Sequence, residues 1–145
     1  MSSTPIDFDV LEKSLFAQGA EEAMLARIFE RVPARRRFCV EFGAGDGRRN
    51  SNTARLLDDG WQGVMIEGSD YRFGQLRAHW AGDPRVRLAQ ARVQPDTVEA
   101  LFAELEVPVD LDLLSIDIDG NDYWVWRAIA RYRPQVVVIE YNPYY

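Results

Sequence analysis

The sequence predicts an α/β protein with a doubly wound parallel sheet and helices on both faces of that sheet. Apolar runs typical of strands alternate with segments of helical periodicity throughout the 145 residues, and this alternation specifies parallel strands joined by right-handed crossovers. Two apolar runs, 113–116 and 136–139, have the composition of central strands that are buried on both faces. Acidic residues also gather at the carboxyl ends of the predicted strands, where such sheets bind their ligands; they are Glu41, Glu67, Asp117, Asp119 and Glu140.

Turn and cap signals set the boundaries of the expected elements. Pro33 and Pro134 end the first and the last predicted helix, and Gly60 is typical of a residue just beyond a helix C-terminus. The spacing of Asp96 and Glu99 matches a capping box that opens a helix. We expect five strands, at 38–42, 63–67, 85–89, 112–118 and 136–140. We expect five helices, at 21–32, 51–58, 70–80, 96–105 and 121–132.

The length of the chain indicates a single domain. Within it we distinguish an N-terminal helical segment, 1–37, from the ligand-binding sheet domain, 38–145. Residues 1–20 carry little periodic signal beyond one short apolar group, which predicts a loose helix or an arm; the group is Val10, Leu11, Leu15 and Phe16.

The composition limits the classes of partner. A hydrophobic content of 47% with 28% charged residues is ordinary for a globular protein. The net charge of −6 argues against non-specific binding to nucleic acid or to an anionic membrane, and the arginines at 35–37 and 48–49 are expected on a solvated face. No run is long enough to span a membrane and the polar N-terminus lacks a signal-peptide pattern. Since the single Cys39 cannot form an internal disulfide, we expect a cytoplasmic protein.

The stretch 38–47, Phe-Cys-Val-Glu-Phe-Gly-Ala-Gly-Asp-Gly, is the most informative part of the sequence. A β-favouring run ends in glycines at alternate positions, which leave a bare backbone turn that a ligand can approach closely. The pattern differs from the G-x-G-x-x-G of a dinucleotide site, and Glu41 would repel a pyrophosphate but suits a cationic ligand. Glu67 follows Gly47 by 20 residues (67 − 47), the offset at which a carboxylate accepts hydrogen bonds from ribose hydroxyls.

This combination resembles the first two motifs of the class I S-adenosylmethionine-dependent methyltransferases, which have a Rossmann-like fold. Over about residues 38–143 the chain resembles, more closely, a bacterial methyltransferase family related to the FkbM-type O-methyltransferases. The strings that carry this resemblance are Glu41-Phe-Gly-Ala-x-Asp-Gly, Ser51-Asn-Thr53, Gly60-Trp-x-Gly-Val-x-Ile-Glu-Gly68, Ser115-Ile-Asp-Ile-Asp-Gly-Asn-Asp-Tyr-Trp-Val-Trp126 and Ile139-Glu-Tyr-Asn-Pro143.

The resemblance implies S-adenosylmethionine as the cofactor and assigns residues to it. Glu41 and the glycine turn would hold the methionine part, Glu67 would hold the ribose, and residues just after the third strand would border the adenine. Asp117 would face the methionine amino group or the acceptor. The implied cofactor-binding residues are Glu41, Gly43, Ala44, Gly45, Asp46, Glu67, Gly68, Ser69, Gln90, Ala91 and Asp117.

The resemblance further implies O-methylation of a small-molecule or sugar-like acceptor. A hydroxyl acceptor must lose its proton, and the candidate catalytic bases are Asp117 and Asp119, which alternation places on one side of the extended chain. The only histidine, His79, is expected to face away from the site. Trp124 and Trp126 are expected to pack their helix against the core rather than to stack on a ligand.

A magnesium ion is a further hypothesis, because some class I O-methyltransferases hold one between an acid after the fourth strand and an acid–amide pair after the fifth. Asp117 or Asp119 would provide the first side here, and Glu140 with Asn142 would provide the second; all are the hard oxygen ligands that magnesium accepts. The alternative is that Glu140 and Asn142 only end the strand and bond the neighbouring loop.

The chain ends soon after the fifth strand, so the sheet is expected to lack the C-terminal antiparallel hairpin that usually follows in this superfamily. The strand at 136–140 would then be an open hydrophobic edge. Such an edge favours pairing with another chain, and we expect a second copy, another partner or residues 1–20 to cover it.

Two other functions remain open. One is a non-catalytic module that binds S-adenosylmethionine or a nucleotide, which the missing hairpin favours. The other is an NAD(P)-dependent oxidoreductase of the same architecture, which the glycine spacing and Glu41 argue against.

Overall fold

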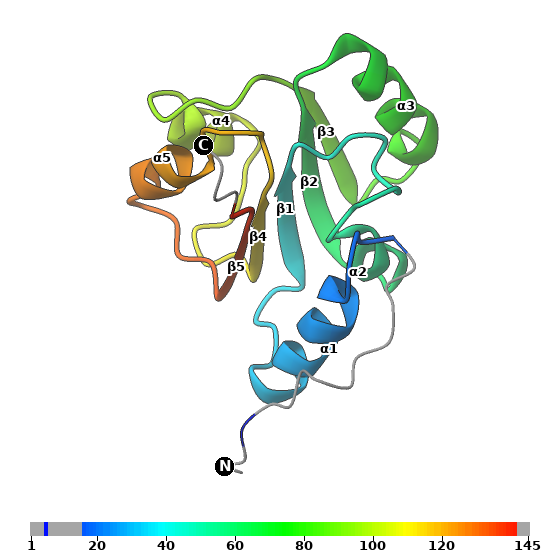
Figure 1. The fold of residues 1–145 in the computed structure, drawn as a ribbon, viewed down its shortest axis with the longest axis vertical. Coiled ribbons are helices and arrows are strands. Elements are labelled where there is room, and N and C mark those ends of the chain that lie inside the picture. The colour runs from blue at the N-terminus through cyan, green and yellow to red at the C-terminus, as the bar shows by residue number, and fades with distance from the viewer. Residues whose placement is uncertain (1–4, 6–15, 142–145) are drawn as a thin grey trace.

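The computed structural model describes residue 5 and residues 16–141, so most of the expected arm at 1–20 lies outside the described residues. Five helices and five strands alternate along the described part (Figure 1), and none of these helices is long and apolar enough to cross a membrane. The helices are α1 (Glu21–Arg31), α2 (Ala54–Asp58), α3 (Asp70–Trp80), α4 (Val98–Glu104) and α5 (Asp122–Ala128). The strands are β1 (Phe38–Phe42), β2 (Gln62–Glu67), β3 (Val86–Gln90), β4 (Leu113–Ile116) and β5 (Val136–Ile139).

All five strands are parallel and lie in the order β3-β2-β1-β4-β5. In the register, Glu41 of β1 lies between Met65 of β2 and Ser115 of β4. The chain therefore runs outward from the centre twice, first from β1 to β3 and then from β4 to β5. This order confirms the predicted α/β, Rossmann-like sheet and places a topological switch point between β1 and β4, where open sheets bind their ligands.

Helices cover both faces of the sheet, as predicted, and Figure 1 shows α4 and α5 on one side with α1, α2 and α3 on the other. Because successive side chains of β1 point to opposite faces of the sheet, this strand contributes to the apolar clusters on both faces. Phe38, Val40 and Phe42 enter the apolar cluster under α4 and α5, whereas Cys39 is buried in the cluster under α1, α2 and α3. Phe42 packs against Phe102 of α4 with 5.5 Å between the ring centroids.

Buried Asp112 joins the segment after α1 to the sheet. Its side chain accepts hydrogen bonds from the backbone N–H groups of Arg35 (2.6 Å), Arg36 (3.0 Å) and Phe38 (2.9 Å). These donors satisfy a carboxylate that would otherwise be costly to bury. Because α1 also packs into the apolar cluster beside β1, the N-terminal helical segment shares the core of the sheet domain.

The strand at 136–139 is not fully buried as its composition predicted, since its residues are half-buried. β5 is an edge strand, in agreement with the edge expected at this strand, and among the described residues only β4 pairs with it. Its alternate side chains nevertheless enter both apolar clusters, Val137 and Ile139 on one face and Val136 and Val138 on the other. A continuous apolar run therefore indicates that helices cover both faces of the strand. It does not indicate that the strand has a neighbouring strand on each side. The other run, 113–116, is central and fully buried, as predicted.

The last helix is shorter than predicted. α5 ends at Ala128, and Ile129 beyond it takes an extended conformation with ψ of 101°. Tyr132 is nevertheless buried, with its ring 4.8 Å from that of Phe102. Apolar side chains of the loop after α5 thus reach the core. Their spacing in the sequence is the same as that of a further helical turn, which explains the longer predicted helix.

The predicted capping box at the start of α4 is also wrong. The N-cap residue is Thr97, and no side-chain hydrogen bond caps the helix there. Glu99 instead accepts hydrogen bonds from the backbone N–H groups of Ala130 (2.7 Å) and Arg131 (2.6 Å). The carboxylate therefore fixes the chain after α5 against α4, a long-range contact that local spacing could not reveal.

Candidate functional site

An open cavity of about 710 Å³ lies at the carboxyl edge of the sheet. Its walls come from the segments that follow β1, β2, β3 and β4, on both sides of the switch point. Of the residues expected to bind a cofactor or to act as a base, those that line it are Gly43, Gly45, Asp46, Glu67, Gly68, Ser69, Ala91, Asp117 and Asp119. Three others do not line it: Glu41, Ala44 and Gln90.

The three glycines of the turn after β1 have three different roles, although each has a positive φ. At Gly43 a side chain would overlap the backbone carbonyl of Asp117, so this glycine lets the end of β1 contact the segment after β4. At Gly47 a Cβ would lie 2.7 Å from the Trp80 ring, so this glycine packs the turn on α3. Only Gly45 faces open space, since no atom lies within 4 Å of a Cβ built there. Gly45 is therefore the position at which the backbone is open to a ligand.

Glu41 lies behind the turn rather than in the cavity. Its carboxylate accepts hydrogen bonds from the hydroxyl groups of Ser51 (2.7 Å) and Thr53 (2.8 Å) and from the backbone N–H of Asn52 (2.8 Å). Burial raises the pKa of Glu41 to about 7, although the three hydrogen bonds act in the opposite direction. Glu41 therefore fastens the start of α2 to the end of β1, and it does not reach the space in which a direct contact with a methionine amino group would form.

Glu67 is the acid that faces the cavity from the end of β2. One carboxylate oxygen accepts a hydrogen bond from the backbone N–H of Gly45 at 2.8 Å, and the other accepts one from the backbone N–H of Ser69 at 2.8 Å. The side chain is buried, with the residue 5% exposed. Each oxygen keeps a second lone pair, so Glu67 can accept hydrogen bonds from a ligand while its position stays fixed.

The segment after β3 forms the far wall. Ala91 lines the cavity and its backbone N–H donates to the carbonyl of Glu67 at 3.2 Å. Gln90 turns outward and donates to the side chain of Asp70, so it does not border the cavity as expected. Ala44, the third expected residue outside the cavity, is buried in the apolar core beside α3.

Two acids after the fourth and fifth strands lie together at the other end of the cavity edge. One carboxylate oxygen of Asp117 and one of Glu140 lie within 4.8 Å of each other. Partial desolvation and the negative charge of Asp117 raise the pKa of Glu140 to about 7, and desolvation also raises the pKa of Asp117. The pair can therefore hold a proton at near-neutral pH and release it within reach of the cavity. Asp119 lines the cavity from the same loop, with φ of 56°.

The acids that could hold a metal differ from the expected set. Asp117, Asp122 and Glu140 each offer one carboxylate oxygen within 4.8 Å of the others. Asp119 is not among them, and Asn142 lies outside the described residues. Both oxygens of Asp122 already accept hydrogen bonds, from the backbone N–H groups of Ile118 (2.8 Å) and Gly120 (3.0 Å). Of the expected ligands, the structure thus brings together Asp117 and Glu140.

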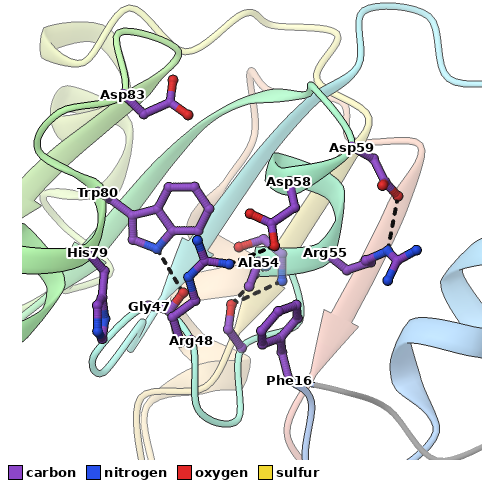
Figure 2. A network of polar contacts seen from close by, with 12 residues as sticks. Phe16, Gly47, Arg48, Ala54, Arg55, Asp58, Asp59, His79, Trp80 and Asp83 are labelled. Carbon is purple, nitrogen blue, oxygen red and sulfur yellow. Dashed lines mark hydrogen bonds and ion pairs between the residues drawn. The ribbon is translucent and has the colours of Figure 1, made fainter.

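The outer side of the glycine turn is anchored by Arg48 (Figure 2). Its guanidinium lies 4.2 Å from the Trp80 ring centroid and 5.4 Å from that of Phe16, and it forms an ion pair with Asp58 at 2.7 Å. The Trp80 ring nitrogen donates to the carbonyl of Gly47 at 2.8 Å. The turn is therefore held from behind by α2, α3 and the residue at 16, so that Gly45 keeps its place relative to Glu67.

Expectations about other single residues have mixed outcomes. His79 does not line the cavity, in agreement with the expectation that it faces away from the site, and its Nδ1 lies 2.7 Å from the carbonyl oxygen of Asp46. Trp124 and Trp126 do not pack into the core, being 55% and 45% exposed. The arginine pair 48–49 is not a uniform solvated face, since Arg48 is anchored and Arg49 lines the cavity.

Some cavity residues were not predicted from the sequence at all. They are polar or charged residues on the loops after β1, β3 and β4 and on the first turns of α3, and they include Arg49, Asn50, Arg72, Gln75, Arg92, Gln94 and Asn121. Their side chains show no periodicity, and in a sequence they look like solvated loop residues. The sequence signal that could have identified them was their position, since each lies in the segment that follows an expected strand.

No protein-family model matches the chain, and no curated protein matches it either. The inference about function therefore rests on the fold and the cavity.

Proposed function

We propose that the chain is an S-adenosylmethionine-dependent methyltransferase that acts on a hydroxyl group of a small-molecule or sugar-like acceptor. One observation carries the proposal. The open backbone at Gly45 and the carboxylate of Glu67 are joined by a 2.8 Å hydrogen bond in one cavity at the switch point of a parallel sheet. A bare turn beside a fixed acceptor of hydrogen bonds suits a nucleoside attached to a short polar chain.

The residues of the cavity fit this cofactor. Glu67 would accept hydrogen bonds from the ribose hydroxyls through its remaining lone pairs, and Gly45 would leave room for the methionine part. Ala91 and Val93, after β3, would border the adenine. When bound, the cofactor would supply an electrophilic methyl group on a sulfonium.

Asp117 and Asp119 are the groups of this chain proposed to accept the proton of the acceptor hydroxyl. Both line the cavity after β4, across the switch point from Glu67. Desolvation raises the pKa of Asp117, and the negative charges of Asp119 and Asp122 act in the same direction, whereas the neighbouring Glu140 acts to lower it. A carboxylate with a raised pKa is a better base near neutral pH.

A magnesium ion at Asp117 and Glu140 is a secondary part of the proposal. A divalent cation would favour the ionised form of both acids and lower the pKa of a bound hydroxyl. Titration of magnesium into the protein by calorimetry, with Glu140→Gln as the matched variant, tests it. Heat of binding that disappears in the variant supports the ion, whereas no heat in the presence of S-adenosylhomocysteine leaves Asp117 and Asp119 as metal-free bases.

Two expectations, one about the cellular compartment and one about the oligomeric state, belong to the same proposal. The lone buried cysteine is consistent with action in the cytoplasm. The outer side of β5, which no described strand pairs, would be covered by a second copy of the chain. Light scattering tests the second expectation, which a monomer at all accessible concentrations would contradict.

Calorimetric titration with S-adenosylhomocysteine is the direct test of the proposed cofactor. Gly45→Val would fill the open space and is expected to abolish binding. Gly60→Val is the matched control, because Gly60 also has a positive φ and has no atom closer than 3.6 Å to a Cβ, but it follows α2 outside the cavity. Binding of NADH instead would favour an oxidoreductase. Binding of S-adenosylhomocysteine without methylation of any hydroxyl acceptor offered would favour a non-catalytic module.

A further inference from the structure

Arginine is nearly the only cationic residue in this chain, and about half of the arginines form polar side-chain contacts with the protein itself. Sixteen of the 17 lysine and arginine residues are arginine. Eight of them form side-chain hydrogen bonds or ion pairs with described residues: Arg27, Arg36, Arg37, Arg48, Arg55, Arg85, Arg87 and Arg133. An arginine that lines a cavity without such a partner therefore keeps its donors available to a ligand.

Three arginines of the cavity wall have that property. Arg49, Arg72 and Arg92 all line the cavity and are exposed. Within residues 16–141, no hydrogen bond or ion pair involves any of their guanidinium groups. Each guanidinium presents five donors in a rigid plane, so the cavity wall offers donors that the protein does not use.

Two of the three lie against the same short segment of backbone, 67–69. The backbone N–H of Arg72 donates to the side chain of Ser69 at 3.5 Å, which places Arg72 in the first turn of α3. The stem of Arg92 packs over Gly68, where a Cβ would come within 3.0 Å of its Cγ. Both arginines therefore flank Glu67, one from α3 and one from the segment after β3.

The carboxylates of the cavity do not neutralise these arginines. Glu67 accepts hydrogen bonds from two backbone N–H groups, and Asp46 accepts two from the backbone of Arg48 and Arg49. The remaining acids, Asp117 and Asp119, follow β4, which lies beyond β1 from the β2 and β3 side in the sheet. Among the described residues, none of these carboxylates bonds the guanidinium group of Arg49, Arg72 or Arg92, so the three guanidinium groups keep their donors for a ligand.

We propose that Arg72 and Arg92, with Arg49 at the margin, form an anion subsite of the cavity that binds the phosphate groups of a phosphorylated small molecule. Guanidinium groups bind phosphate through charge-assisted hydrogen bonds, the strongest type available to exposed side chains. The one carboxylate of S-adenosylmethionine could engage only one of the three. The subsite thus goes beyond the proposed methyl transfer and does not depend on it.

The phosphate could belong to either of two ligands. It could be carried by the methyl acceptor, which would then bind together with the cofactor, or by an adenine nucleotide that occupies the cofactor position itself. Competition separates these sources. Pyrophosphate that binds equally well in the presence of saturating S-adenosylhomocysteine indicates a phosphorylated acceptor, whereas mutual exclusion of ADP, pyrophosphate and S-adenosylhomocysteine indicates a nucleotide.

The test is calorimetric titration of the full chain with pyrophosphate and with ADP at about 50 mM salt, where charge interactions are weakly screened. Arg72→Gln and Arg92→Gln are each expected to weaken binding about tenfold, the usual effect of losing charge-assisted hydrogen bonds. Arg77→Gln is the matched control, because Arg77 is an exposed arginine of the same helix α3 that does not line the cavity. It is expected to change the affinity less than about twofold.

Two results would overturn the subsite. One is absence of pyrophosphate and ADP binding to the unmodified chain. The other is an equal loss of affinity in Arg77→Gln, since this would show that the anion is attracted to the overall charge of the surface and not to a specific site. Thermal unfolding of each variant checks that it is folded, and a variant that fails this check is replaced by Arg→Lys at the same position, which keeps the charge but loses the planar geometry. Pyrophosphate binding without any S-adenosylhomocysteine binding would refute the methyltransferase proposal and leave the subsite standing.

Discussion

The two halves of the cavity edge use their acids in opposite ways. On the β1–β2 side, Glu41 and Glu67 are buried, and each oxygen of both carboxylates accepts a hydrogen bond from a hydroxyl or a backbone N–H. On the β4–β5 side, Asp117 and Glu140 are exposed, and an oxygen of each carboxylate lies within 4.8 Å of one of the other. The first pair fixes backbone in place, whereas the second pair is exposed, so that a ligand can exchange a proton with it.

The acids on the β1–β2 side therefore position the backbone, whereas the acids on the β4–β5 side are suited to proton transfer. A carboxylate saturated by donors has one stable geometry and holds the loops that contact it. A carboxylate that shares a proton with a second one changes charge within the physiological pH range. Four substitutions test the comparison, from the largest expected effect to the smallest.

Gly43→Ala should have the largest effect on stability, because Gly43 is the residue at which the β1–β2 half of the cavity edge contacts the β4–β5 half. The new methyl group would overlap the carbonyl of Asp117, and we expect a loss of at least about 3 kcal/mol in the free energy of unfolding. Gly45→Ala is the control, since it has a similar positive φ but faces open space; it should lose about 1 kcal/mol. Urea unfolding measures both, and equal losses would show that the contact with Asp117 carries no strain.

Glu41→Gln should change how stability depends on pH. The pKa of Glu41 is raised by burial from 4.5 to about 7, so the folded state binds more protons than the unfolded state between these values. Stability contributed by the protonated group is therefore fully present below pH 4.5 and is lost as the pH rises through 7. The expected loss is about 3 kcal/mol, and it should be absent in the variant. Parallel pH series of urea unfolding decide this, and identical slopes would mean that Glu41 titrates normally.

Glu67→Ala should weaken the binding of S-adenosylhomocysteine about 10- to 100-fold, since a fixed charged acceptor of ribose hydroxyls is lost. The same substitution frees the backbone N–H groups of Gly45 and Ser69, so Glu67→Gln, which keeps one acceptor oxygen, serves as the comparison. Calorimetry measures both affinities. Unchanged binding in the alanine variant would remove Glu67 from the cofactor site.

Glu140→Gln should have the smallest effect, a change in the shape of the pH–rate profile for methyl transfer. Because the pKa of Glu140 is raised to about 7 beside Asp117, the second negative charge of the pair appears only above that pH and makes Asp117 a stronger base. The unmodified chain should therefore gain activity, by up to about tenfold, through pH 7. The variant should lack this step while Asp119→Asn keeps it. A step of equal size in Glu140→Gln would assign the ionisation to another group.

The parts of this structure that could be read from the sequence are those fixed by local chemistry. The glycines of the turn required positive φ, and the run at 113–116 required burial, so both were predictable without knowledge of the fold. The direction of Glu41 was not predictable, because the segment 51–53 that binds its carboxylate comes from a later part of the chain. The arginine at 92 was not predictable either, since only the order of the strands brings it beside Glu67.

The two tryptophans of α5 show a failure of a different kind. Positions 124 and 126 are two residues apart, and residues at this spacing do not share one face of a helix. Asp122 and Val125 take the buried face of α5, which leaves both indoles exposed. An aromatic-rich string is thus a poor indicator of core when its spacing does not match the helical repeat.

Asp122 has a mechanical consequence for the proposed base. Its carboxylate binds the N–H groups of Ile118 and Gly120, so the loop that carries Asp117 and Asp119 is clamped to the first turn of α5. These two hydrogen bonds tie the positions of Asp117 and Asp119 to the start of α5. The same helix exposes Trp124 and Trp126. A partner that bound these rings and displaced α5 would therefore also displace the acids at the cavity.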